Sequence, residues 1–172
     1  MISDPFYWSR DWAWGVPLIL LNVVIHIVGL GFLSHRVARL SREAVSSSPM
    51  IALVMVAGTT TLLATVLHGM EAGIWAGAYM FLGAFPDFKY SMLYSLNAIT
   101  SYGHTGLNLE KPWQLLGALE ALNGWLLFGL TTAFMFAAIQ GVWLAGIRQT
   151  LDVLREPEGT RNVVRQPTKL SK

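Results

Sequence analysis

Three long apolar segments, separated by polar stretches, dominate the hydrophobic pattern of the chain. The first covers residues 16–34, the second covers 50–70 with an extension to Leu82, and the third covers 112–148. A helix of about 20 apolar residues is long enough to cross the hydrocarbon core of a bilayer. The pattern therefore predicts an all-α membrane protein with three transmembrane helices.

The stretch between the second and third segments, residues 94–109, is too short and too polar to cross a bilayer. Its first part belongs to a helix candidate at Lys89–Ile99, and its second part, 100–106, is small, polar and contains glycine. Non-helical backbone survives at membrane depth only inside protein or beside a water-filled path. We therefore predict a re-entrant segment, in which a pore helix is followed by a pore loop.

Composition and charge agree with a membrane protein. Of the 172 residues, 53% are hydrophobic and 13% are charged, and the net charge of +2 gives no indication of nucleic-acid binding. The absence of cysteine from the sequence excludes disulfides and thiolate metal sites. Most of the 12 Lys and Arg residues lie within 35–49 or from Arg148 onward. The positive-inside rule then places the N-terminus and the pore loop outside, and the C-terminus in the cytoplasm, of a plasma (bacterial inner) membrane.

The pattern divides the chain into three parts. Residues 1–49 hold an aromatic anchor, an extra transmembrane helix and a cytoplasmic loop that starts at His35. The aromatic residues before the first span indicate either anchorage at the membrane interface or a short surface helix. Residues 50–148 form the predicted pore domain, and residues 149–172 form a basic cytoplasmic tail.

Polar side chains within the apolar segments are candidate site residues. Asn22 and His26 lie one turn apart on one face of the first span, which indicates an interhelical hydrogen bond or, alternatively, a proton-linked pair. His68 and Glu71 lie one turn apart in the second span, and Glu120 lies in the third. Acidic residues at membrane depth mark either a buried partner or an ion pathway.

Short motifs on both sides of the loop follow one another without gaps: Glu71-Ala72, Trp75-Ala76, Leu82-Gly83-Ala84, Tyr94-Ser95, Thr100-Ser101, residues 113–124 and residues 128–133. Over residues 68–140 the chain resembles the pore domain of the potassium channel family, and most closely its small bacterial members with an additional N-terminal helix. The resemblance implies a homotetramer in the lipid bilayer that conducts monovalent cations, K⁺ or Na⁺. It implies neither an enzyme nor a cofactor.

The filter candidate departs from the family pattern. Where the family has Thr-Val-Gly-Tyr-Gly-Asp, this chain has Ser101-Tyr102-Gly103-His104-Thr105-Gly106, preceded by Thr100. Backbone carbonyls from four chains replace the hydration shell of the ion, which requires backbone angles that glycine reaches without cost. Thr105 stands at one such glycine position, at a penalty of about 1–2 kcal/mol. We therefore expect weak or atypical cation selectivity.

His104 has three interpretations. Its ring bonds to the pore helix, as the tyrosine of the family does; or it faces the pore and titrates near neutral pH; or it binds an ion or metal directly.

The resemblance implies roles for further residues. Five residues are expected to support the filter on the side that faces away from the pore: Tyr94, Asn97, His68, Glu71 and Glu120. The inner cavity and a hinge are expected to be formed by Gly124, Phe128, Gly129, Thr131 and Thr132. Gly124 also fits an ordinary packing glycine.

Three functions remain open at this point. The leading one is a tetrameric cation channel with an altered filter. The second is a non-conducting relative that acts as a membrane sensor or partner subunit, because the filter signature is lost while its surroundings are retained. The third is a membrane metalloenzyme with His68, Glu71, Glu120 and His104 as metal ligands. The lack of a nucleophile motif in the sequence speaks against it.

Overall fold

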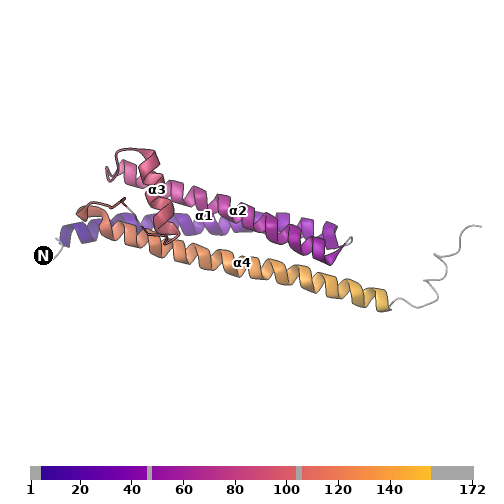
Figure 1. Cartoon of the computed structure of the whole chain (residues 1–172). Coiled ribbons are helices and arrows are strands. Elements are labelled where there is room, and N and C mark those ends of the chain that lie inside the picture. The colour runs from indigo at the N-terminus through magenta and orange to yellow at the C-terminus, as the bar shows by residue number, and fades with distance from the viewer. Residues whose placement is uncertain (1–4, 46–47, 104–105, 156–172) are drawn as a thin grey trace, which may run out of the picture.

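The computed structural model describes residues 5–45, 48–103 and 106–155, and those residues form α-helices without any strand (Figure 1). The helices are α1 (Pro5–Val45), α2 (Pro49–Phe81), α3 (Phe88–Ile99) and α4 (Gln114–Arg155), and a short 3₁₀ turn, η1 (Lys111–Trp113), precedes α4. Residues 8–37, 50–81 and 114–151 are long and apolar enough to cross a membrane. The prediction of an all-α membrane protein with three such helices is confirmed.

The first helix is longer than the sequence analysis predicted. A cytoplasmic loop was expected at residues 35–49, but α1 continues to Val45. That expectation was wrong because residues 35–45 contain Arg, Leu, Glu and Ala, which are good helix formers, and no glycine or proline. The predicted start of the second helix agrees with the structure, since Ser48 is its N-cap and Pro49 its first residue.

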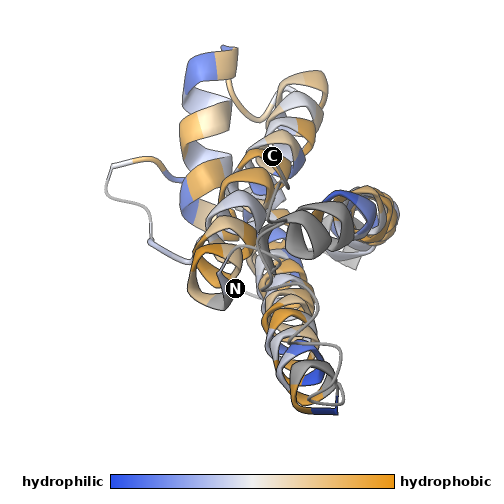
Figure 2. Cartoon of the chain, turned by 90° about the vertical axis from the view of Figure 1, so that its right-hand side faces the viewer, coloured by the Kyte–Doolittle hydropathy of each residue, from blue (hydrophilic) through white to orange (hydrophobic). Residues whose placement is uncertain are grey.

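The three long helices run side by side along most of their length (Figure 1). Contacts of Gly15 with Leu119, and of His26 with Thr131, make α1 and α4 parallel. Gly29 contacts Leu67 and His26 contacts Glu71, so α2 runs antiparallel to α1. Large apolar side chains are exposed on all three long helices, among them Phe32, Leu62 and Trp143. Figure 2 shows that apolar residues recur along the helices, and their exposure is expected for helices that face lipid.

The short helix α3 crosses the bundle at the end where α2 ends and α4 begins (Figure 1). The Asp87 side chain caps its N-terminus by accepting a hydrogen bond from the Tyr90 amide at 3.0 Å. Its last residue, Ile99, packs against Gly124 of α4. Gly124 lies about ten residues into α4, or roughly 15 Å along the helix axis, which is about half of a 30 Å hydrocarbon core. The chain then returns to the start of α4, at the end of the bundle from which α3 began.

Candidate functional site

A buried carboxyl group on α4 fixes the position of α3. The Glu120 side chain is fully buried, and its Oε2 accepts a hydrogen bond from the Tyr79 hydroxyl of α2 at 2.7 Å. Its Oε1 is hydrogen-bonded to the Ser95 hydroxyl of α3, and this hydroxyl also lies 2.7 Å from the Ala72 carbonyl oxygen of α2. Glu120 therefore joins α2, α3 and α4 through one carboxyl group.

An aromatic cluster surrounds this carboxyl group. The rings of Tyr79 and Tyr94 meet edge to face with centroids 5.3 Å apart, and Phe85 lies 5.2 Å from Tyr94. Such pairs add about 0.5–1.5 kcal/mol to the apolar area that they bury. The Tyr94 phenol is buried, and a phenol is uncharged at neutral pH. The cluster therefore packs the middle of α3 against α2 without introducing a charge.

Two glycines of α4 allow α3 to approach closely. A Cβ atom at Gly117 would overlap the Tyr94 hydroxyl, and one at Gly124 would overlap the carbonyl of Ile99. Small residues at helix crossings permit this kind of approach in membrane proteins. The site of the predicted hinge, Gly124, thus carries a packing contact that any other residue would disturb.

The loop after α3 adopts backbone angles that favour glycine. Gly103 has φ +95°, Gly106 has φ +83°, and Ser101 has φ +54° although it is not a glycine. Tyr102 is 81% exposed. The predictions made for His104 and Thr105 concern residues outside the described part of the chain, and they stay predictions. The strain that the described residues reveal lies instead at Ser101.

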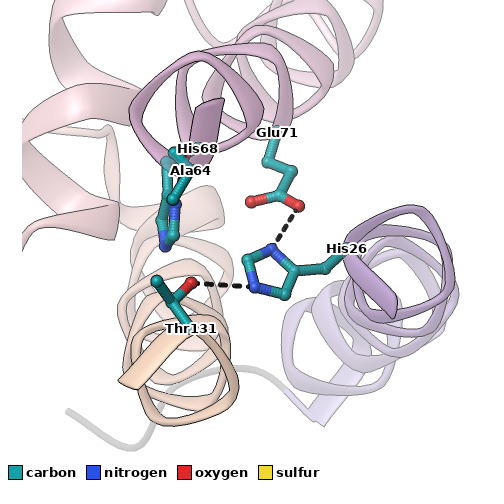
Figure 3. Close-up of polar contacts among 5 residues, drawn as sticks. All are labelled: His26, Ala64, His68, Glu71 and Thr131. Atoms are coloured by element: carbon teal, nitrogen blue, oxygen red, sulfur yellow. Dashed lines mark hydrogen bonds and ion pairs between the residues drawn. The ribbon is translucent and has the colours of Figure 1, made fainter. Parts of the chain in front are cut away.

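A second buried cluster lies between α1, α2 and α4 (Figure 3). Nδ1 of His26 lies 2.8 Å from Oε1 of Glu71, and its Nε2 lies 3.0 Å from the Thr131 hydroxyl. The His68 ring meets the His26 ring edge to face, with centroids 5.1 Å apart, and its Nδ1 lies 2.8 Å from the Ala64 carbonyl oxygen. Both His26 and Glu71 are fully buried.

The structure divides the predicted filter-support group into two places. Tyr94 belongs to α3, and Glu120 contacts α3 through Ser95. Glu71 and His68 instead contact His26, which the sequence analysis had grouped with Asn22. Asn97 lies on α3, and its carbonyl accepts a hydrogen bond from the Tyr102 amide at 3.0 Å.

The predicted inner-cavity group is divided as well. Thr131 faces α1, whereas Phe128, Gly129 and Thr132 are exposed. The proposed metalloenzyme set is not assembled within the described residues, because Glu120 is bonded to Ser95 and Tyr79, away from the other candidates.

The sequence did not reveal Ser95 and Tyr79 as the partners of Glu120. It also did not reveal the contact between His26 of α1 and Glu71 of α2. Ser95 belongs to the Tyr94-Ser95 motif, so that motif was a usable signal for it. The pairing of His26 with Glu71 depends on how two helices are rotated toward each other, which the chain order does not reveal.

Comparison of the chain with protein-family models, with curated proteins and with solved structures finds no match.

Proposed function

We propose that the protein is a tetrameric cation channel in which each chain contributes residues 100–106 to a shared pore. The observation that carries this proposal is the path of the chain around α3. This short helix ends against Gly124, roughly 15 Å along α4 from its start, and the chain then returns to the end of the bundle from which α3 began. Pore loops of channels follow this kind of path.

The exposure of the loop supports assembly of several chains. In the single chain Ser101, Tyr102 and Gly103 are all exposed. Backbone polar groups at membrane depth cannot face lipid, because hydrocarbon offers no hydrogen-bond partner. Neighbouring copies around a water-filled axis would satisfy them. The exposed apolar face of α4, with Leu122, Trp125 and Phe128, offers a surface against which a neighbouring chain can pack.

Electrostatics favour a cation at this position. The C-terminus of α3 adjoins the loop, and a helix C-terminus carries a partial negative charge of about half an elementary unit. No Lys or Arg occurs between Lys89 and Lys111 in the sequence. The altered sequence around Gly103 argues against strict potassium selectivity, so weak selectivity among monovalent cations is the expected behaviour.

Ion flux into proteoliposomes tests this function. Purified protein is reconstituted, and the flux is compared with potassium, with sodium and with a large organic cation as the only cation outside. We expect potassium and sodium to enter and the organic cation to be excluded. Vesicles that stay silent with both small cations, at several voltages and pH values, would contradict the channel and favour the non-conducting relative.

A further inference from the structure

His26, His68 and Glu71 offer three metal-ligating side chains at one point inside the bundle. Each contributes one ligand atom, and these atoms all lie within 4.8 Å of one another. His26 comes from α1, while His68 and Glu71 come from adjacent turns of α2 (Figure 3). We infer that these three residues bind a divalent transition-metal ion of the Zn²⁺ class, which links α1 to α2. This inference is independent of ion conduction.

Glu71 supplies an independent observation that points to a ligand. Its side chain is fully buried, and Oε1 is paired with His26, but Oε2 has no hydrogen-bond partner among the described residues. A buried carboxylate oxygen without a partner costs about 1–3 kcal/mol, and more when the group is charged. Figure 3 shows this oxygen turned toward the side of His68. A bound cation would satisfy it.

The remaining nitrogens of the imidazoles are held as in metal sites. Ligating histidines usually give their second ring nitrogen to a carbonyl, a carboxylate or water, which fixes the ring. The Ala64 carbonyl lies 2.8 Å from Nδ1 of His68, which directs Nε2 of that ring to act as an acceptor. Thr131 lies 3.0 Å from Nε2 of His26 and can either donate or accept, so it fits both tautomers.

Metal binding requires a balanced proton transfer. Without metal, Nδ1–H of His26 donates to Glu71. In this state Nε2 of His26 carries no hydrogen and accepts from the Thr131 hydroxyl. When Zn²⁺ binds through Nδ1, the Nδ1 proton leaves to solvent and Nε2 takes up one proton from solvent, which it donates to Thr131. The ring stays neutral, and the two proton transfers balance. Zinc holds nitrogen and oxygen ligands at about 2.0–2.2 Å, so the three side chains must close in around the ion. Protein ligands then fill three positions and leave one for water.

A cavity adjoins the site. A cavity of about 420 Å³ reaches His68, and its other lining residues include Thr61, Thr65, Thr100 and Thr131. Threonine hydroxyls can replace part of the water shell of an entering ion. Thr100, at the start of the loop, also lines this cavity, so the cavity connects the side of His68 with the loop.

Metal titration of the purified full-length protein tests the inference. The protein carries a purification tag that lacks histidine, is stripped with a chelator, and is titrated with Zn²⁺ in a calorimeter and with Co²⁺ under visible absorption. We expect one ion per chain and the intense absorption of four-coordinate Co²⁺. Absence of stoichiometric binding by the wild-type protein would overturn the inference without reference to any variant.

Variants assign the binding to the cluster. We expect His68→Gln and Glu71→Gln to abolish it, and Thr131→Val to weaken it roughly tenfold by removing the partner of His26. His35→Gln is the control, because His35 is exposed on α1 and lies outside the cluster. Equal affinity in wild type, His68→Gln and Thr131→Val would place the ion elsewhere and overturn the assignment. Helical circular dichroism of each variant shows that it is folded.

Discussion

At the scale of single residues, the contacts of Ser95 constrain the proton count of the buried site. Its hydroxyl carries one hydrogen but lies at hydrogen-bonding distance from both the Ala72 carbonyl and Oε1 of Glu120. Both contacts are satisfied together only when Oε1 of Glu120 is protonated and donates to Ser95, which then donates to Ala72. The geometry therefore favours a neutral carboxyl group, which also suits a fully buried position.

This proton count predicts a contrast between two substitutions of Glu120. In Glu120→Gln the amide NH₂ can donate to Ser95 while the amide oxygen accepts from Tyr79, so we expect thermal stability close to wild type. Glu120→Ala leaves two buried hydroxyls without this partner and should cost about 2–4 kcal/mol. Thermal unfolding in detergent measures both. If Gln were as damaging as Ala, the carboxyl group would have to be charged, and the proton count would be wrong.

The positive φ angles of the loop predict opposite effects at two neighbouring positions. Ser101→Gly should be tolerated, because glycine reaches φ +54° without the penalty of about 1–2 kcal/mol that serine meets. Gly103→Ala introduces that penalty at φ +95°. Cation flux and thermal stability are measured for both variants and compared with those of the wild-type protein. Damage at Ser101 with tolerance at Gly103 would mean that the loop has a different conformation in the working protein.

At the scale of elements, the crossing of α3 and α4 is the contact that fixes the end of α3, where the loop begins. The Ile99 carbonyl occupies the space that a side chain at Gly124 would need. Glu120 and the aromatic cluster fix the middle of α3, whereas Gly124 fixes its end. The position of the loop therefore depends on the absence of a side chain at residue 124.

Two glycine substitutions in α4 test this dependence. Gly124→Ala should displace the end of α3, which we expect to reduce cation flux at least tenfold. Gly141→Ala is the matched control on the same helix, since no atom lies within 4 Å of a Cβ placed there. Flux assays and thermal unfolding are run on both. Equal flux in the two variants would show that the contact between Ile99 and Gly124 does not position the loop.

Much of the element pattern could be predicted from the sequence, and most of the site contacts could not. Apolar runs reveal spans directly, and the polar stretch after them marked α3 within one residue of its start. The end of α1 was missed because charged residues were interpreted as a loop, although they are good helix formers. Side-chain partners such as His26 with Glu71 depend on helix rotation and register, which apolar runs leave undetermined.

At the scale of the whole molecule, two separate features predict the orientation of the chain in the membrane. The positive-inside rule places the end with Lys89 and Lys111 outside, because Arg36, Arg148 and Arg155 lie toward the other end. The path of the chain places the start of α3 and the start of α4 at one end of the bundle. Together they predict that the loop approaches the pore from the outer surface.

Single cysteines test this topology, because the native chain contains none. Cysteines that replace the exposed residues Lys89 and Glu110 should both react with a membrane-impermeant thiol reagent added outside intact cells. A cysteine at Thr150, near the far end of α4, should react only after lysis. Reaction of positions 89 and 110 from opposite sides would mean that the segment between them crosses the membrane rather than returning.

The most direct test of the pore is cation flux through a Tyr102→Cys variant in liposomes, measured before and after a charged thiol reagent is added on the loop side. Tyr102 is 81% exposed in the single chain, in the loop that we place at the shared axis. We predict that the variant conducts and that the reagent blocks it, while wild-type protein, which lacks cysteine, is unaffected. Unchanged flux after complete modification of the thiol would contradict the account, because the ion would then pass by a route that avoids this loop.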